Sequence, residues 1–528
     1  MFNQSRLKFT FIVFFILLTF VLVDIFQLQT REFESTSQVI DQQNLDKFYI
    51  RAPRGEIFDA TGEKIAETKL EPHLFINMRK ITNQNSSDYK QIIQYNFPEL
   101  ATKEINEIFE SKDILNSVIN LSSVEYEVSN NLLTNFDAFL IIDLPIRKYI
   151  KNELFSHTVG YLGIPNQDEF NKFQNALGNN QVGKNGLERY YEEYLSGIPG
   201  ELIFSGSDIV DSKQPIPGKD LFLSIDSATQ IVTKESLQQG LDLANKSFES
   251  QNEIKKGASV VLDIETGYIV SMVSLPDFDP NKFVSGISDF EYKQLDRDQA
   301  FNNFAIQGLY PPGSVFKVVA YWLALSENIF PEGLNTKDSK VDCEGSLSFG
   351  FDDGSQQVYN DWKLEGHGKV DLTDAIKQSC NVYFWDIALN IWRNFGNTDG
   401  ESILQEYSKE LGFSEKTNVD LPFEKVGIIP DRDLFEEWKI SRPGLVREEG
   451  WLGGDLMNLI IGQGAITTTP LQVANAYRTL LTGENLSPTL NINAEKITNN
   501  KINVSDEFIS FLLKDLNTVT NKGGTAYV

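Results

Sequence analysis

The sequence predicts an α+β protein, on three observations. A turn at Glu265-Thr266-Gly267 separates two short apolar stretches, 257–263 and 267–273, which have the length and composition of paired strands. Helical patterns follow this hairpin instead of alternating with strands, an order typical of α+β domains. The chain has 528 residues, enough for two or three domains with sizeable cores. We therefore expect an antiparallel sheet flanked by helices.

The composition excludes one class of partner. Lys and Arg total 47 against 74 Asp and Glu, a formal charge of −27, which repels nucleic acid. The two cysteines, Cys343 and Cys380, are too few for a disulfide framework. One disulfide bond and a metal site both remain open for them.

An apolar segment near the N-terminus predicts a membrane anchor within residues 1–27. Residues 9–23 carry no charge and follow Arg6 and Lys8. Fifteen residues are few against the roughly 20 that span a bilayer, but flanking residues extend the apolar surface. A cleaved signal peptide is the alternative. Because the basic residues precede the segment, we expect a cytoplasmic N-terminus, a single pass through the inner membrane and a periplasmic remainder.

The region 28–214 is expected to form an elongated pedestal. Within it, 50–66 has the pattern of a hairpin with a D-x-x-G turn, and 184–200 that of a capped helix ending at Gly and Pro. A Pro- and Gly-rich turn then places a boundary before the last domain, 215–528. Three charged side chains are available for ion pairs that fix the pedestal's shape: Arg51, Arg54 and Glu188.

The stretch 310–325 contains a candidate nucleophile with a base beside it. Two prolines and a glycine break the chain, and a buried helix is expected to begin at Ser314. Lys317 is the only charged residue between Ser314 and Ser326. Positions three apart lie on one helix face, so the Lys317 ammonium should fold back toward the Ser314 hydroxyl.

This pairing suits nucleophilic catalysis. A serine hydroxyl attacks a carbonyl poorly until a base takes its proton, and a lysine can act as that base only when it is neutral. Desolvation in an apolar helix lowers a lysine pKa and so favours the neutral form of Lys317. The alternative is a lysine that extends to the surface from an ordinary core helix.

A second group follows at Ser379-Cys380-Asn381, 65 residues after Ser314. Together, S-x-x-K and S-x-N form a pattern found in penicillin-binding proteins and class A β-lactamases. The chain resembles class B penicillin-binding proteins over nearly its whole length, most closely those of the penicillin-binding protein 2 type. The resemblance rests on the apolar N-terminal segment and on five motifs in the expected order, at 52–55, 184–188, 310–314, 379–381 and 461–464.

The resemblance implies a penicillin-binding transpeptidase domain, active in cell elongation without a catalytic cofactor. Ser314 would attack the penultimate D-Ala carbonyl of a stem peptide ending in D-Ala-D-Ala, and Lys317 would take its proton. Ser379 would pass a proton to the leaving D-Ala, and Asn381 would hold Lys317 and the substrate amide. The implied partners are stem peptides, β-lactams, a polytopic glycan polymerase and the inner membrane.

The family's third motif, K-[ST]-G, has no match in the chain. The segment Lys522-Gly523-Gly524-Thr525-Ala526 has glycine where the hydroxyl belongs. It is similar to a G-G-T-A element that precedes the motif in the family. We therefore expect the sequence to be a fragment whose C-terminal strands are missing, because an open sheet edge would be a stability liability. An inactive protein is the alternative.

The resemblance also implies a structural zinc ion. Penicillin-binding protein 2 carries an Asp, Asp, His, Cys site beside its S-x-N motif, and four N, O and S ligands suit tetrahedral zinc with no open position. From the residues alone, we would favour a polar loop with a core thiol over a metal site. The matching positions here are Asp342, Asp361, His367 and Cys380.

Three functions follow from these patterns. The first is a serine-type D-Ala-D-Ala transpeptidase or carboxypeptidase that β-lactams acylate. A β-lactamase or β-lactam sensor shares S-x-x-K but has no need of the long module before residue 215. A non-catalytic cell-wall scaffold is the third, if Val528 is the true end of the chain.

Overall fold

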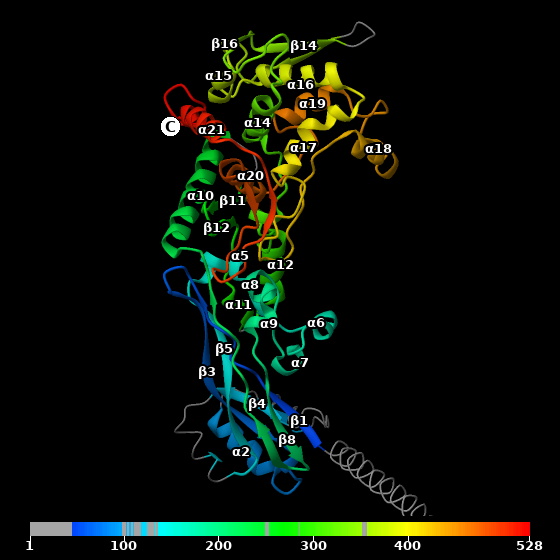
Figure 1. The fold of residues 1–528 in the computed structure, drawn as a ribbon. Helices are drawn as coiled ribbons and strands as arrows, with labels where there is room; N and C mark the ends of the chain where they lie inside the picture. Colours follow the sequence, from blue (N-terminus) through cyan, green and yellow to red (C-terminus); the bar gives the residue numbers. More distant parts are fainter. Residues whose placement is uncertain are drawn as a thin grey trace, which may run out of the picture.

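The computed structural model describes residues 45–97, 136–248, 253–284, 286–350 and 356–527, with short stretches between 102 and 133. Figure 1 shows an elongated molecule, with long strands at one end and a helical domain at the other. This arrangement agrees with the predicted α+β class and with a pedestal that carries a second domain. The predicted membrane anchor lies outside the described residues. No helix among the described residues is long and apolar enough to span a bilayer.

Two sheets build the pedestal. In the larger sheet the strand order is β10-β2-β3-β4, and β5 also pairs with β3; the smaller sheet has the order β1-β8-β9. β3 pairs with β5 in antiparallel register from Ala66↔Tyr149 to Ile76↔Phe139, which gives the pedestal its length. The strands are β1 (Leu45–Ile50), β2 (Ile57–Phe58), β3 (Lys64–Asn77), β4 (Val118–Ser123), β5 (Phe139–Tyr149), β8 (Gly200–Ser205), β9 (Asp208–Lys213) and β10 (Leu221–Phe222).

The predicted D-x-x-G hairpin is confirmed between β2 and β3. Asp59 Oδ1 accepts hydrogen bonds from the backbone N–H groups of Thr61 and Glu63, both at 2.9 Å. A carboxylate that bonds to the backbone two residues ahead stabilises a turn. Short helices complete this part of the chain: α2 (Ser86–Asn96), α5 (Ser156–Val159), α6 (Gln167–Lys172), α7 (Ala176–Asn179), α8 (Gly186–Tyr190) and α9 (Glu192–Leu195).

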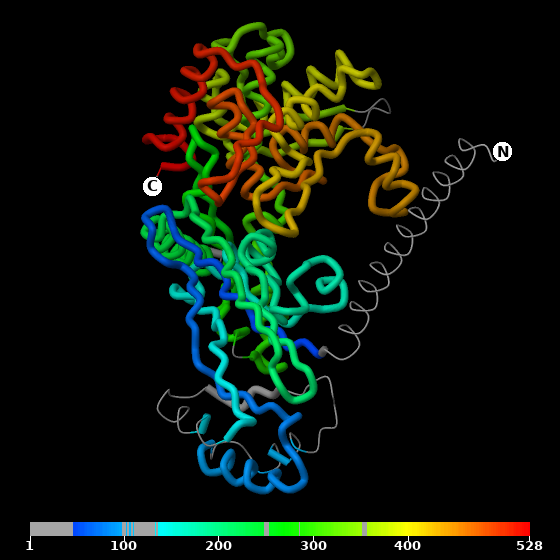
Figure 2. The backbone as a smooth tube through the Cα atoms, turned by 60° about the horizontal axis from the view of Figure 1, so that its bottom comes forward, coloured from blue at the N-terminus to red at the C-terminus, as the bar shows by residue number. Residues whose placement is uncertain are grey.

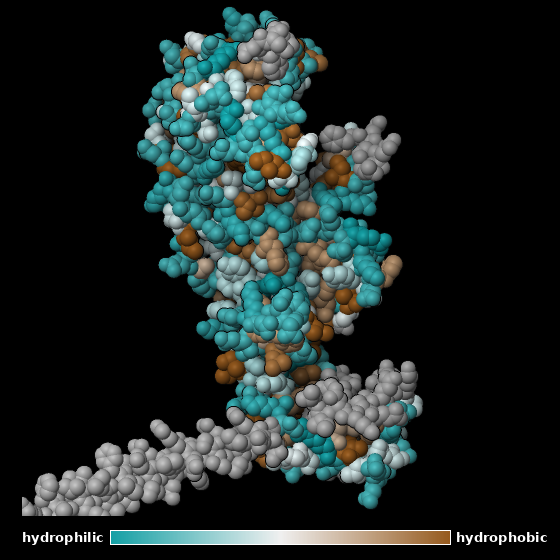
Figure 3. Space-filling view, turned by 90° about the vertical axis from the view of Figure 1, so that its right-hand side faces the viewer, coloured by the Kyte–Doolittle hydropathy of each residue, from teal (hydrophilic) through white to brown (hydrophobic). Residues whose placement is uncertain are grey.

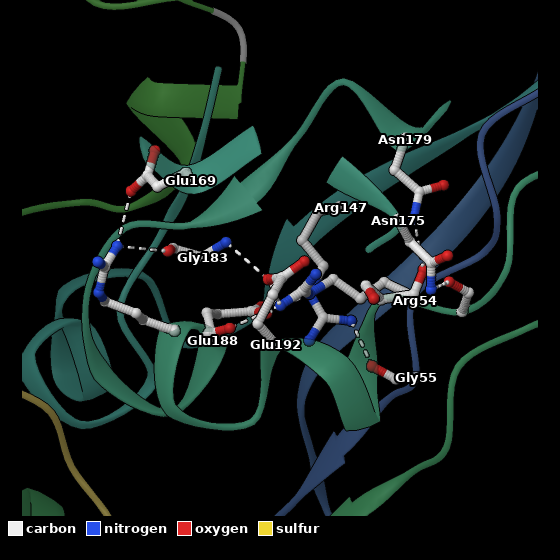
Figure 4. A network of polar contacts seen from close by, with 12 residues as sticks. Arg54, Gly55, Arg147, Glu169, Asn175, Asn179, Gly183, Glu188 and Glu192 are labelled. Carbon is white, nitrogen blue, oxygen red and sulfur yellow. Dashed lines mark hydrogen bonds and ion pairs between the residues drawn. The ribbon is translucent and has the colours of Figure 1, made fainter. Parts of the chain in front are cut away.

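A buried ion network ties these helices to the strands (Figure 4). Arg54 forms ion pairs with Glu188 and, at 2.7 Å, with Glu192, and Arg147 Nε lies 2.8 Å from Glu188 Oε1. Burial opposes ionisation of Glu188, but Arg147 and Arg54 hold its pKa below the usual value. Arg54 and Glu188, two of the three side chains expected to form ion pairs, therefore pair with each other, and they join the loop before β2 to α8.

The second domain contains the predicted hairpin. β11 (Gly257–Leu262) and β12 (Ile269–Leu275) pair in antiparallel register. Three helices pack against them: α10 (Ser227–Phe248), α13 (Phe304–Gln307) and α20 (Pro470–Thr482). The side chains beneath this hairpin share one core with the pedestal strand β2 and with α8, which joins the two parts of the molecule.

The helix that follows Ser314, α14 (Lys317–Glu327), lies in a different core. Its buried side chains pack with those of α16 (Asn381–Phe395), α17 (Ile403–Glu410) and α19 (Gly453–Ile460). This core is separate from the one beneath the hairpin of β11 and β12. Because α14 is apolar on every face, it is stable only when all of its faces are buried, and the helices on several sides of it bury them.

The C-terminal segment closes over this helical core. Figure 2 shows it in red against the green and yellow helices, at the end of the molecule away from the blue strands. α21 (Asp506–Thr520) packs on α15 (Leu372–Lys377), and Tyr321 donates a hydrogen bond of 2.8 Å to the buried Asp515. The segment 522–526 forms a turn after α21. The remaining helices and strands are α11 (Asn281–Val284), α12 (Asp289–Arg297), α18 (Arg432–Ser441), β6 (Leu162–Gly163), β7 (Val182–Gly183), β13 (Val341–Cys343), β14 (Ser346–Gly350), β15 (Gln356–Asn360), β16 (Gly368–Val370), β17 (Glu484–Leu486) and β18 (Thr498–Lys501).

Candidate active site

Ser314 lies exposed in a tight turn before a buried helix. The turn is a 3₁₀ helix over Gly313–Phe316, and the α-helix begins at Lys317. The expected start at Ser314 is therefore three residues early, because the Lys317 N–H bonds back to the Ser314 carbonyl in the tighter pattern. The consequence is a hydroxyl open to substrate, next to a lysine in the core.

A second loop holds this turn in place. Gly313 N donates a hydrogen bond of 2.9 Å to Gly462 O, in the 461–464 motif after α19. Gly462 has a φ of +72°, and a Cβ built there would lie 2.2 Å from the Gly313 carbonyl oxygen. Only glycine permits this approach. The motif therefore acts through backbone packing, which positions the residue before Ser314.

Lys317 is buried, with 1% of its surface exposed. Its Nζ donates to Ser379 O at 2.8 Å, Ser379 Oγ at 3.0 Å and Asn381 Oδ1 at 2.7 Å. Burial lowers the pKa of Lys317 to about 8, although the nearby Cys380 and Asp361 oppose this shift. The alternative of a surface lysine is wrong. This shift brings the neutral form of Lys317, which a base requires, within reach of neutral pH.

Ser379 connects Lys317 to Ser314. Its hydroxyl donates to Ser314 Oγ at 2.9 Å and accepts from Lys317 Nζ. Among the hydrogen bonds of the described residues, Lys317 thus reaches Ser314 through Ser379, where the helix spacing had predicted direct contact. Ser379 lies between α15 and α16 with a φ of +51°, a conformation that costs about 1–3 kcal/mol and is often found at functional sites.

Asn381 is placed by a carboxylate. It is the first residue of α16, and its backbone N–H donates to Asp361 Oδ2 at 2.7 Å, as the N–H of Val382 does at 3.3 Å. Asp361 therefore satisfies the free N–H groups at the start of this helix. The sequence had indicated Asp361 only as a metal ligand. Its position before Trp362 in a polar loop carried no signal for capping a helix 20 residues later.

Trp362 is a residue of this site that sequence reasoning did not single out for a role. Its side chain is 59% exposed, and its Nε1 lies 3.3 Å from Gln378 O and 3.2 Å from Ser379 O. The Ser379 carbonyl that accepts from Lys317 therefore also accepts from the indole. A large aromatic side chain in a polar loop was the available signal.

Three of the four predicted metal ligands lie together. A ligand atom from each of Cys343, Asp361, His367 and Cys380 lies within 4.8 Å of the others. Asp342 is not in this group, so that assignment is wrong. Side chains alternate along β13, and Cys343 is buried while Asp342 faces solvent.

The cluster fits zinc chemically. Two sulfurs, an imidazole and a carboxylate are ligands that zinc accepts in closed structural sites. His367 Nδ1 lies 3.4 Å from Cys343 Sγ and 3.9 Å from Asp361 Oδ2, and the two sulfurs lie 3.3 Å apart. Burial lowers the pKa of His367, which favours the neutral imidazole that a metal requires.

Two protein-family models match the chain. The family model of the penicillin-binding protein transpeptidase domain matches residues 257–528, more than half of the chain. The family model of the penicillin-binding protein dimerisation domain matches residues 49–223. The chain belongs to the penicillin-binding protein transpeptidase family. Within the family it is similar to a peptidoglycan D,D-transpeptidase MrdA from Acinetobacter baumannii, at 30% identity over 85% of this chain. The chain spans 63% of that relative's length.

Solved structures agree with this membership. Penicillin-binding protein 2 of Helicobacter pylori, in complex with MreC, matches 92% of this chain and 85% of its own, with a TM-score of 0.71 and 28% identity. A chain of a peptidoglycan synthase complex that coordinates polymerization and crosslinking matches 99% of this chain and 86% of its own length, with a TM-score of 0.66 and 25% identity. The resemblance to class B members of the penicillin-binding protein 2 type is confirmed.

Proposed function

We propose that the chain is a serine D,D-transpeptidase that crosslinks peptidoglycan stem peptides ending in D-Ala-D-Ala during cell elongation. The observation that carries this proposal is the hydrogen-bonded line from the buried Lys317 through Ser379 to the exposed Ser314. Such a line supplies an activated nucleophile at the surface and a base in the core.

The first step is acylation. Ser314 Oγ attacks the penultimate D-Ala carbonyl, and its proton moves through Ser379 Oγ to the neutral Lys317 Nζ. Backbone N–H groups, that of Ser314 among them, stabilise the oxyanion, with a typical contribution of about 2.7–4 kcal/mol per donor. The carbon–nitrogen bond then breaks, and the leaving D-Ala takes the proton back through Ser379. Terminal D-Ala departs, and the stem peptide stays on Ser314 as an ester.

The second step resolves this ester. The amine of a neighbouring stem peptide attacks the same carbonyl and gives its proton to Lys317 through Ser379. The bond between the carbonyl carbon and Ser314 Oγ then breaks, Ser314 takes the proton back through the same relay, and the crosslink is formed. Water in place of the amine gives carboxypeptidase activity. A β-lactam mimics the peptide bond, acylates Ser314 and stays attached, so we propose this class of drug as an inhibitor. Asn381, bonded to Lys317 through its side chain, keeps the ammonium aligned.

No cofactor takes part in these steps. We propose that Cys343, Asp361, His367 and Cys380 hold one structural zinc ion. Because Asp361 also bonds to the Asn381 N–H, the ion would fix the loop that places Ser379 and Asn381.

We propose the cellular location and the protein partners of the chain from its relatives and its sequence. We place the chain as a single-pass protein of the inner membrane with most of its mass in the periplasm. Its apolar N-terminal segment supports this placement. A polytopic glycan polymerase and a partner of the MreC kind are proposed neighbours, supported by the complexes in which the similar structures were solved.

Labelling with a fluorescent penicillin tests the function. The full-length protein should form a stable adduct that peptide mapping places on Ser314, and Ser314→Ala should form none. Rapid release of the label would indicate a β-lactamase. A folded protein that forms no adduct would contradict the proposal and favour a non-catalytic scaffold.

A further inference from the structure

A groove lies between the pedestal and the second domain, apart from Ser314. One wall comes from α8 and α9 and the other from the loop 416–424, and the cavity volume is about 690 Å³. In Figure 1, α8 and α9 lie midway along the molecule, while α14 lies in the upper domain. Pockets between domains are frequent binding sites. The proposed mechanism uses none of the residues of this groove.

Aromatic rings line the groove and face solvent. Tyr190 is 51% exposed, Tyr194 39% and Phe423 53%. Figure 3 shows this side of the molecule as mostly hydrophilic, with hydrophobic residues scattered along its length. Single exposed aromatic residues need no explanation, but three around one cavity indicate a binding surface.

One of these rings is held out by a strained backbone. Phe423 has a φ of +65°, a conformation that non-glycine residues rarely adopt. The Arg189 guanidinium lies 5.3 Å from its ring centroid and 6.0 Å from that of Phe173. Arg189 Nη1 is itself bonded to Glu169 at 2.7 Å. The wall is therefore fixed before any ligand arrives, which lowers the entropy cost of binding.

Both domains also fix the floor of the groove. Tyr191 OH donates to Asp420 Oδ2 at 3.0 Å, and Asp420 accepts from the backbone N–H of Leu490 at 2.7 Å. Tyr191 lines the groove on one wall, and Asp420 lies between the lining residues Val419 and Leu421 on the other. The width of the groove is therefore set by a direct bond between the pedestal and the second domain.

The charges of the groove narrow the class of ligand. The lining holds three cations and three carboxylates, in a chain with a net charge of −27: Lys172, Arg189, Lys416, Glu192, Glu193 and Glu424. Flat rings bordered by both donors and acceptors suit a saccharide, whose C–H faces stack on aromatic rings while its hydroxyls form hydrogen bonds. The cations also suit carboxylates carried along such a chain. The negative net charge of the chain disfavours nucleic acid as the ligand.

We propose that this groove binds a glycan strand of peptidoglycan, with sugar rings stacked on Tyr190, Tyr194 and Phe423. This inference rests on the proposed function, since the crosslinking reaction acts on stem peptides attached to such strands. A second contact away from Ser314 would hold the polymer by its sugars while the peptide reacts. Two sites on one polymer increase its effective concentration at the reaction centre.

Binding of stem-free glycan strands to the full-length protein tests the proposal. Strands stripped of their peptides cannot react at Ser314, so their binding reports on sugar contacts alone. We expect Tyr190→Ala and Phe423→Ala each to weaken the Kd by about tenfold, and Tyr190→Phe, which keeps the ring, to retain binding. Tyr95→Ala, at a position 86% exposed on α2, is the matched control and should bind as the wild type does.

Penicillin labelling of Ser314 in the same samples separates the two proposals. Normal labelling with weakened strand binding supports the groove. If both alanine variants label normally and bind strands with a Kd within twofold of the wild-type value, the groove proposal is wrong. It is also wrong if the strands do not bind, and free stem peptides bind instead in a way that Tyr190→Ala weakens. Loss of labelling in the wild-type protein contradicts the catalytic proposal instead.

Discussion

The hydroxyl of Ser379 donates a hydrogen bond to Ser314 Oγ at 2.9 Å, although 65 residues separate them. The same hydroxyl accepts from Lys317, so one small side chain is the contact between the proposed nucleophile and the proposed base. The proposed proton transfer from Ser314 to Lys317 therefore runs through Ser379.

Ser379→Ala should slow penicillin acylation by about 10²–10⁴-fold, the usual contribution of a positioned proton-transfer group. The thermal midpoint should change little, because the side chain is small and only half-buried. Stopped-flow labelling measures the rate. Ser510→Ala, at an exposed position on α21, is the control and should acylate normally. If Ser379→Ala acylates at a rate close to that of the wild type, Ser379 is not a proton relay.

Acylation should rise with pH and level off above about 8. Burial lowers the pKa of Lys317 to about 8, and only its neutral form accepts a proton, so the active fraction grows as pH rises through that value. Below it the rate should fall roughly tenfold per pH unit. Lys317→Met, which keeps the length of the side chain, should lose most activity and this dependence. The same pH profile in Lys317→Met would assign the titration to another group.

Zinc content should depend on Cys343 and not on Asp342. Cys343→Ser and His367→Ala should each lower the metal measured in the purified protein, because each removes one of the four clustered ligands. Asp342→Asn should leave it unchanged, since that side chain points to solvent. Elemental analysis after dialysis gives the ratio of zinc to protein. Unchanged zinc in Cys343→Ser and His367→Ala, or none in the wild type, would contradict the site.

Glu188→Ala should destabilise the pedestal by about 3–5 kcal/mol, because it leaves Arg54 and Arg147 buried with their shared partner removed. Glu193→Ala, at an exposed position on α9, is the matched control and should cost little. Urea unfolding measures both changes. The folded pKa of Glu188 is depressed, so its contribution is present above the unfolded pKa and is lost as pH falls through the folded value. Equal stability of the two variants would show that the pair contributes no net stability.

Local spacing accounts for the sequence predictions that hold. The turn at Asp59, the hairpin of β11 and β12 and the helix after Ser314 each depend on residues within a few positions of one another. Such patterns are set by backbone geometry and are visible without the fold. The groove with Phe423 was invisible for the opposite reason. Its two walls are more than 200 residues apart, and a strained φ leaves no mark in the residue type.

The sequence by itself determined that a serine and a lysine share one turn at the start of an apolar helix, and that this lysine is the only charged residue nearby. Only the tertiary structure decided that Ser379 stands between them, that Asp361 caps α16, and that Cys343 rather than Asp342 faces the histidine. The physical reason is that helix spacing is fixed by local hydrogen bonds. Which strand face is buried, and which distant loop reaches the site, depends on the packing of the whole domain.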